Sequence, residues 1–258
     1  MERRLPARPA FLFFPRLFPR YNARRKSAMD ALIEYSPSLL AGAWITLQVA
    51  LLSLVLAVSM GLVGAACKLS RIAPLRWWTA LYTTVFRGVP DLVMMLLFFY
   101  GGQVILNVIS DHLEREMIEL DAFAAGVLTI GFIFGAYFTE TFRGAFQAVP
   151  AGQMEAGRAY GMSGWQVFWH ILFPQMLRYA LPGIGNNWLV LLKSTAIVSM
   201  IGLADMTWLA DQAGRSTHQP FTFYLAVCVL YLAMTAVSNQ VLQRLQRRYN
   251  VGVREANV

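Results

Sequence analysis

Apolar residues in this chain fall into long runs that are separated by short polar connections. Five runs are long enough to cross about 30 Å of hydrocarbon as a helix of roughly 20 residues. They are Leu39–Ala65, about Thr79–Asn107, Ala122–Phe142, Leu181–Leu203 and Phe221–Leu242. The pattern therefore predicts an all-α integral membrane protein with about five transmembrane helices.

The second run contains a polar interruption, FRGVPD, at residues 86–91. Arg87 and Pro90 would break a helix or mark the point where it enters the membrane, so we expect the apolar core of this span nearer Val89–Ile109. Backbone groups that a break leaves unpaired must find partners inside the protein, because lipid offers none.

Glycines recur within the predicted spans, with Gly61 and Gly64 in the first and Gly131 and Gly135 in the third. Small residues at this spacing let membrane helices approach one another closely. The spans should therefore form a packed bundle.

The composition supports a membrane protein and excludes several kinds of site. The chain of 258 residues is 57% hydrophobic and only 14% charged, whereas soluble domains carry about 25% charged residues. The three histidines are isolated, and the sequence contains neither a phosphate-binding G-x-x-x-x-G-K-[ST] motif nor a set of nucleophile and base. We expect no catalytic residue, no metal and no cofactor bound by this chain, and no ATPase activity of its own.

The positive charge is concentrated at the start of the chain. Residues 1–28 carry a net charge of +7, and the rest of the chain carries +1, so the excess does not support nucleic-acid binding by the whole protein. Four prolines split this segment, which has no apolar core typical of a signal peptide or a span. We expect residues 1–28 to be a disordered or untranslated extension, with a transmembrane domain over 29–258.

The connections between the runs predict the orientation. Basic residues outnumber acidic ones in three connections: residues 66–78, residues 143–180 and the C-terminal tail. The other two connections, residues 108–121 and 204–220, hold one arginine each and more acidic than basic residues. Because basic connections face the cytoplasm, this alternation predicts an external start near Met29 and a cytoplasmic C-terminus.

A cytoplasmic stretch, EAGRAYGMSGWQVFWHILFP (155–174), predicts two short helices around a turn at GMSG (161–164). Ser163 and Gln166 have the spacing of a capping box for the second helix, and Pro174 is expected to end it. Such a helix pair is shaped to fit the groove of a partner protein. A helix that lies flat on lipid headgroups is the alternative.

This stretch resembles the E-A-A loop of the membrane permeases of bacterial ATP-binding-cassette (ABC) importers, E-A-A-x-x-x-G followed by nine residues and I-x-L-P. Gly157 replaces the second Ala and Phe173 replaces the Leu. The resemblance implies that residues 144–180 form a loop that docks on a cytoplasmic ATPase, with Glu155 close to a helix N-terminus, where negative charge is favourable. The residues that it assigns to this coupling are Glu155, Ala156, Gly157, Gly161, Ile171 and Pro174.

The likeness covers about residues 30–258. FRGVPDLVMMLLFFYG (86–101), the segment at 135–157 and the segment at 176–199 are similar to permeases of the polar amino-acid subfamily, which includes histidine/lysine/arginine/ornithine and opine importers. The resemblance implies a type I importer bundle in a bacterial inner membrane. It also implies a second permease subunit, either a similar chain or a second copy, two ATP-binding subunits that hold ATP and Mg, and a periplasmic substrate-binding protein.

Polar residues in or beside the spans are candidates for the translocation pathway or for structural ion pairs. Glu140 and Arg143 are three residues apart, so they can pair on one helical face. A structural pair is the favoured interpretation, and steering of a cationic substrate by Glu140 is the alternative. The candidates are Arg87, Pro90, Asp91, Glu140, Arg143, Lys193, Ser194 and Thr195.

Two other function classes fit the sequence less well than a permease. An ion-coupled secondary transporter is disfavoured because five spans with no detectable inverted repeat and a docking loop do not fit that class. A membrane-embedded enzyme is disfavoured because no reactive set of side chains is present.

Overall fold

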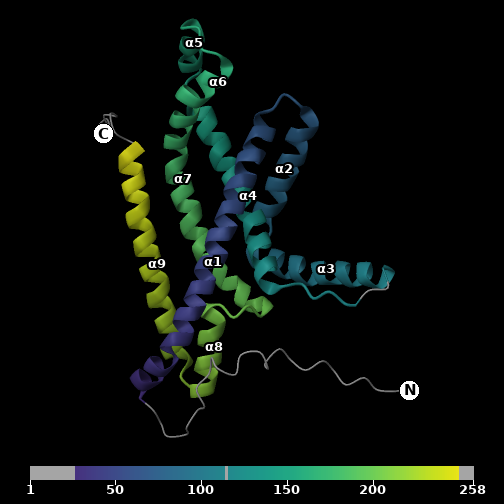
Figure 1. Cartoon of the computed structure of the whole chain (residues 1–258), viewed down its shortest axis with the longest axis vertical. Coiled ribbons are helices and arrows are strands. Elements are labelled where there is room, and N and C mark those ends of the chain that lie inside the picture. The colour runs from purple at the N-terminus through teal and green to yellow at the C-terminus, as the bar shows by residue number, and fades with distance from the viewer. Residues whose placement is uncertain (1–26, 114–115, 250–258) are drawn as a thin grey trace.

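The computed structural model describes residues 27–113 and 116–249, and within these ranges the regular structure is entirely helical (Figure 1). The expectation for residues 1–28 falls almost entirely on residues 1–26, which lie outside the described residues. The elements are α1 (Ala28–Leu69), α2 (Ala73–Gly88), α3 (Asp91–His112), α4 (Ala122–Ala148), α5 (Ala151–Ala159), α6 (Gly164–Val167), the π-helical turn η2 (Phe168–Leu172), α7 (Phe173–Ser194), the 3₁₀ helix η3 (Thr195–Ile201), α8 (Met206–Thr217) and α9 (Pro220–Tyr249).

Five helical segments of the described chain are long and apolar enough to cross a membrane, which confirms the predicted number of spans. The first is longer than its apolar run, because α1 extends over 42 residues and includes Pro37. Pro37 lacks the N–H that would bond the carbonyl of Ile33. The Ser36 hydroxyl donates to that carbonyl instead, at 2.8 Å, so the helix continues through the proline.

The predicted interruption of the second run is a complete helix break. α2 ends at Gly88, residues 89 and 90 are extended, and α3 starts at Asp91. In Figure 1, α3 lies nearly across the direction of α1 and α4. The break therefore redirects the chain within the membrane domain, as FRGVPD predicted.

The main core lies where α1 packs along α4. A Cβ added at Gly61 would collide with Phe138, and one added at Gly64 would collide with Thr139. Only glycine permits this approach, so the prediction of a close, glycine-lined helix contact is confirmed. Large buried side chains of α4, among them Phe134, Phe138 and Phe142, fill the core beside this contact.

A second core joins the start of α1 to α8 and α9. Tyr35 and Phe223 meet edge to face with their ring centroids 5.5 Å apart, and both are buried. Ala31, Leu39 and Met206 belong to the same cluster. These contacts anchor the first turns of α1, which precede the apolar run.

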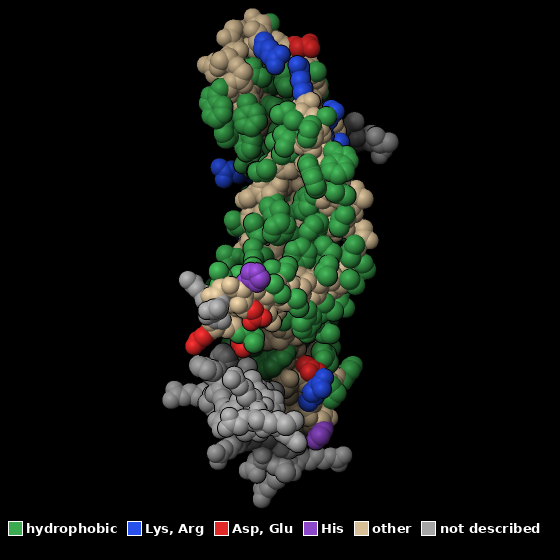
Figure 2. Space-filling view, turned by 90° about the vertical axis from the view of Figure 1, so that its right-hand side faces the viewer, with side chains coloured by type: hydrophobic (Ala, Val, Ile, Leu, Met, Phe, Trp, Pro, Cys, Tyr) green, Lys and Arg blue, Asp and Glu red, His purple; other side chains and the backbone are tan. Residues whose placement is uncertain are grey.

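Several of the connections and helix ends gather at the two ends of the bundle. The α1–α2 turn, α5, α6 and the end of α9 lie at the upper end of Figure 1, whereas the start of α1 and α8 lie at the lower end. Figure 2 shows hydrophobic side chains over the middle of one face and several Lys and Arg side chains near the upper end. An apolar belt between polar ends is what a bilayer requires.

Candidate functional site

The helix pair α5 and α6 extends beyond α4 and α7 at the upper end of the bundle (Figure 1). Glu155 and Ala156 lie on α5 with exposed side chains. Helix α5 starts at Ala151 and has no acidic residue in its first turn. The expected position of Glu155 beside a helix N-terminus is therefore wrong: it lies in the second turn, where the interaction with the helix dipole is weaker.

The turn between α5 and α6 depends on Gly161, which has a φ of 79°. This left-handed conformation favours glycine. The Gly161 N–H donates to the carbonyl of Arg158 at 2.9 Å, and the Met162 N–H donates to that of Gly157 at 3.1 Å. The α5 C-terminus is thereby closed.

The capping box predicted for the second helix is confirmed. The Ser163 hydroxyl accepts from the Gln166 N–H at 3.3 Å, and the Gln166 side chain accepts from the Ser163 N–H at 2.8 Å. Two N–H groups that the helix start leaves free are satisfied in this way.

Gly157 lies inside the helix pair. It is buried, and a Cβ at this position would lie 2.5 Å from Ile171 Cδ1 and 3.3 Å from Val167 Cγ2. Gly157 and Ile171 therefore hold α5 against the segment that follows α6. The exposed residues Glu155 and Ala156 remain available to a partner.

Pro174 does not end the second helix, so this prediction is wrong. Helix α6 passes through the π-helical turn η2 directly into α7, and Pro174 occupies the first turn of α7. In η2 the Phe173 N–H bonds Phe168 O, five residues back. The wider π turn accommodates the proline, which has no N–H and would crowd the preceding turn of a regular α-helix. The projecting helix is thus continuous with a membrane helix.

An aromatic cluster covers the outside of this unit. Trp165 lies 5.5 Å from Trp169 between ring centroids and 6.3 Å from Phe168. Trp165 is 71% exposed and Tyr160, at the end of α5, is 90% exposed. Large exposed apolar side chains at a projecting tip are typical of a surface that binds a partner.

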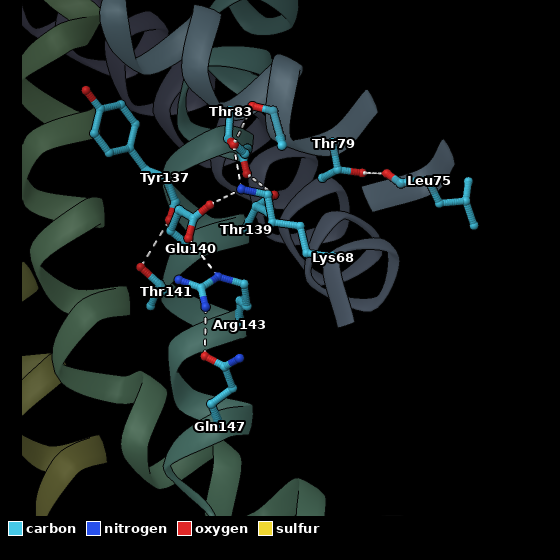
Figure 3. A network of polar contacts seen from close by, with 12 residues as sticks. Lys68, Leu75, Thr79, Thr83, Tyr137, Thr139, Glu140, Thr141, Arg143 and Gln147 are labelled. Atoms are coloured by element: carbon cyan, nitrogen blue, oxygen red, sulfur yellow. Dashed lines mark hydrogen bonds and ion pairs between the residues drawn. The ribbon is translucent and has the colours of Figure 1, made fainter. Parts of the chain in front are cut away.

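A polar network joins α1, α2 and α4 within the membrane domain (Figure 3). Lys68 donates to Thr83 Oγ1 at 2.7 Å and forms an ion pair with Glu140. The Arg143 guanidinium pairs with the other Glu140 oxygen at 2.8 Å and donates to Gln147 at 2.7 Å.

The predicted pairing of Glu140 with Arg143 is confirmed, whereas Lys68 is a partner that the local sequence pattern does not predict. Lys68 is 72 residues away in sequence, so no local spacing connects it with Glu140. The one indication in the sequence is the position of Lys68 directly after the first apolar run, where a basic side chain commonly pairs with an acidic one. With both oxygens occupied by cations, Glu140 is better explained as part of a structural network than as a residue that attracts a cationic substrate.

A polar hollow of about 480 Å³ opens beside this network. Its lining comes from α1, α2 and α4 and consists of Lys68, Thr83, Thr84, Arg87, Gly88, Tyr137 and Glu140. The Arg87 guanidinium lies 5.2 Å from the centre of the Tyr137 ring, a cation–π contact that orients it. In the described part of the chain, no carboxylate forms an ion pair with Arg87.

The remaining candidates lie around the helix break and the end of α7. Pro90 caps α3, and Asp91 in its first turn accepts from the Ser194 hydroxyl at 3.2 Å. Thr195 is buried and bonds Leu192 O at 2.7 Å, whereas Lys193 is exposed. The structure thus brings Asp91 and Ser194 together, and the Thr195 hydroxyl also lies 3.4 Å from the Tyr231 hydroxyl of α9.

The chain is similar to known transport proteins over most of its length. The family model of binding-protein-dependent transport system inner membrane components matches residues 53–251. The histidine/lysine/arginine/ornithine transport system permease protein HisQ of Salmonella typhimurium is 54% identical over 227 residues, which cover 88% of this chain and 100% of the relative. The nopaline transport system permease protein NocQ of Agrobacterium fabrum is 42% identical over 83% of this chain and 91% of the relative.

Solved structures share the fold. The crystal structure of an amino acid ABC transporter with histidines superposes with a TM-score of 0.74 at 33% identity, over 86% of this chain and 99% of the other. An inward-facing MetNI methionine ABC transporter superposes with a TM-score of 0.65 at 19% identity, over 82% of this chain and 95% of the other, and supports the fold alone.

Proposed function

The chain belongs to the family of binding-protein-dependent transport system inner membrane components, and from this premise we propose that it is the permease subunit of an ABC importer. Its substrates are basic amino acids or opines, which it carries into the cytoplasm by alternating access. Relatives with both kinds of substrate in their names support this class.

The observation that carries the proposal is the projecting unit α5–α6–η2. It holds the E-A-A pattern in register, presents Glu155, Ala156 and exposed aromatic rings outward, and continues into the membrane helix α7. An ATPase groove that receives this unit could move α7 without a flexible linker in between.

ATP hydrolysis is supplied by partner subunits, which bind ATP and Mg. When two such subunits close on ATP, each would displace the α5–α6 unit that it holds. Gly157, packed against Ile171, makes the unit move as one body, and the unbroken helix carries the displacement into α7 and η3. The bundle would thereby switch between inward-open and outward-open states.

The pathway is proposed to run past the break between α2 and α3. Arg87 lies directly before the break. Asp91 lies directly after it and accepts a hydrogen bond from Ser194 of α7. Broken helices at membrane depth tolerate unpaired backbone where they face protein or water, and they commonly form substrate sites. Lys193 and Thr195 belong to the neighbouring turn and are assigned to its support.

A complete transporter requires further chains. Helices α3 and α9 bury little of their surface within this chain, which fits a second permease subunit, either a similar chain or a second copy. Two ATPase subunits and a periplasmic binding protein complete the proposed assembly. The basic end that carries α5 and α6 faces the cytoplasm, so the start of α1 faces the periplasm and the C-terminus the cytoplasm.

Co-purification and uptake test the proposal. The chain, purified from its native host, should copurify with an ATPase and give ATP-dependent uptake of a basic amino acid or an opine in proteoliposomes. Uptake that follows an imposed ion gradient and needs no ATPase would instead support the secondary transporter, which no observation now favours.

Glu155→Lys sharpens this test. The variant should remain in the membrane but bind less ATPase, because an exposed acid at the docking surface becomes a base. Glu119→Lys makes the same charge change at an exposed position in the α3–α4 connection, away from the α5–α6 unit, and should behave like the wild type. Equal ATPase recovery in both variants would refute the docking surface.

A further inference from the structure

The hollow between α1, α2 and α4 has an unbalanced positive charge. Two cationic side chains, Lys68 and Arg87, and one carboxylate, Glu140, line it. Arg143 pairs with that same carboxylate from outside the lining, which adds a further positive charge close by. A cation entering this hollow would meet net repulsion, whereas an anion would be attracted.

Glu140 is not free to receive a ligand. One of its oxygens is taken by Lys68 and the other by Arg143, and its side chain is 20% exposed. Lys68 is similarly committed, because it also donates to Thr83. The network is therefore closed on itself and forms a fixed wall of the hollow.

Arg87 differs from the other cations around the hollow. Its side chain is exposed, no carboxylate of the described residues pairs with it, and its contact with the Tyr137 ring leaves its N–H groups available. It lies in the last turn of α2, directly before the helix break. The net positive charge of the hollow and this unpaired guanidinium favour an anionic ligand.

We propose that this hollow is the subsite for the carboxylate of the transported molecule, with the Arg87 guanidinium as its binding group. The inference rests on the proposed function, because every α-amino acid and every opine carries at least one carboxylate. The planar guanidinium binds a carboxylate through two parallel N–H···O bonds. Tyr137 orients the guanidinium plane, and the exposed Thr84 hydroxyl on the same wall is a further donor.

The dimensions fit this assignment. A volume of about 480 Å³ lies within the roughly 300–1,000 Å³ of small-molecule pockets. There is open space beside Gly88, one residue after Arg87, where an added Cβ would meet nothing within 4 Å. A carboxylate can therefore reach the guanidinium beside the break without moving the backbone.

The direct test uses the assembled permease–ATPase complex in nanodiscs of phosphatidylcholine, without the binding protein. Equilibrium binding is measured for two probes, L-arginine and L-argininamide, which differ only in the carboxylate. The wild type should bind L-arginine at least about tenfold more tightly than the amide, because a charge-assisted bidentate contact is lost. Equal affinity for the two probes, or no binding of either at millimolar concentration by a complex that transports, overturns the inference.

Substitutions assign the effect to Arg87. Arg87→Gln should lower the affinity for L-arginine at least about tenfold and leave that for L-argininamide nearly unchanged. Arg87→Lys should restore part of the discrimination, since it keeps the charge but loses the fork geometry. Arg76→Gln removes an exposed cation from the same helix outside the hollow and should behave like the wild type.

A second variant keeps the test decisive if Arg87→Gln fails to assemble. Thr84→Glu places a competing carboxylate on the exposed wall of the hollow, where it can pair with Arg87. It should weaken L-arginine binding at least about tenfold in a complex of normal size. Wild-type affinity in a well-assembled Thr84→Glu complex contradicts the proposal.

If another anion occupies the hollow in place of the substrate carboxylate, the binding experiments give a different result. If a lipid phosphate occupies the hollow, Arg87→Gln should reduce copurifying phosphatidylglycerol and leave the difference between arginine and its amide intact, which overturns the carboxylate subsite. Binding-protein-dependent uptake by the wild type is measured in parallel. Loss of that uptake for every amino acid and opine would refute the proposed function itself, whereas normal uptake with no role for Arg87 refutes only this inference.

Discussion

Lys68, at the end of α1, forms an ion pair with Glu140, which lies 72 residues later in α4. The pair joins the two helices of the main core on the side where Gly64 of α1 meets Thr139 of α4. Because Arg143 occupies the second carboxylate oxygen, Glu140 is held from both sides. The network fixes the relative position of α1, α2 and α4 near the hollow.

We predict that Glu140→Gln destabilises the assembled protein and lowers uptake of all substrates together. The substitution leaves two cations in a partly buried site without their common partner, at a cost of about 1–3 kcal/mol. Thermal unfolding of the purified complex measures this loss. A double-mutant cycle with Lys68→Met gives the coupling energy between the two residues.

The control is Asp211→Asn, which removes the acid from the Arg215 ion pair. The Arg215 side chain is 76% exposed, and such surface pairs contribute about 0–1 kcal/mol. A stable Glu140→Gln complex whose uptake falls for cationic but not for neutral substrates would instead revive the hypothesis that Glu140 steers cations.

We predict that Gly161→Ala weakens ATPase binding and that Gly161→Asn weakens it less. Gly161 has a φ of 79° and open space around it, so the penalty comes from the backbone alone and amounts to about 1–2 kcal/mol for alanine. Asparagine tolerates this conformation better. Pull-down of the ATPase measures the effect, and Gly164→Ala, also in open space, should be harmless. A larger loss for Asn than for Ala would mean that the side chain itself obstructs docking.

We predict that Gly157→Ala uncouples ATP hydrolysis from transport and that a second substitution at Ile171 repairs it. The added Cβ would lie 2.5 Å from Ile171 Cδ1, so α5 must move away from η2. Replacing Ile171 with Val removes that methyl group and relieves the contact. Substrate-stimulated ATPase activity should fall in Gly157→Ala and recover in the double variant. If the double variant is no better, Gly157 acts at the partner surface and not inside the helix pair.

The sequence predicted the parts of this fold that depend on local patterns. Run length predicted five spans, Arg87 and Pro90 predicted the helix break, and Ser163 with Gln166 predicted a capping box. The failures have a different physical origin. A local rule predicts that Pro174 ends a helix, but a π turn that ends two residues upstream, at Leu172, accommodates it. Lys68 reaches Glu140 only because α1 folds back along α4, which no local spacing encodes.

Asp205 was missed for the same reason, since its surroundings come from distant elements. It caps α8 by accepting from the Trp208 N–H at 2.8 Å, and it is fully buried. Its second oxygen, Oδ2, has no hydrogen-bond partner among the described residues. Thr46 of α1 bonds the adjacent Met206 N–H at 3.3 Å, so the start of α8 is fastened between the first helix and this carboxyl group.

We predict that Asp205→Asn stabilises the protein more at pH 8 than at pH 5. Burial raises the pKa of the Asp205 carboxyl from 3.8 to about 6, although backbone N–H groups of Trp208 and Thr207 favour the charged form. At a pH between these two pKa values, the folded state holds more protons than the unfolded state. The stability of the protein therefore falls as the pH rises from about 4 to about 6. The penalty is complete above this window and amounts to at most about 3 kcal/mol. Asparagine keeps the capping oxygen and carries no charge, so it avoids the penalty.

Thermal unfolding at pH 5 and pH 8 measures the difference in stability between the Asp205→Asn variant and the wild type. The control is Asp121→Asn, which replaces the exposed cap of α4. If Asp205→Asn raises the stability equally at both pH values, ionisation of the Asp205 carboxyl does not destabilise the folded protein. A donor outside this chain must then stabilise the unpartnered oxygen.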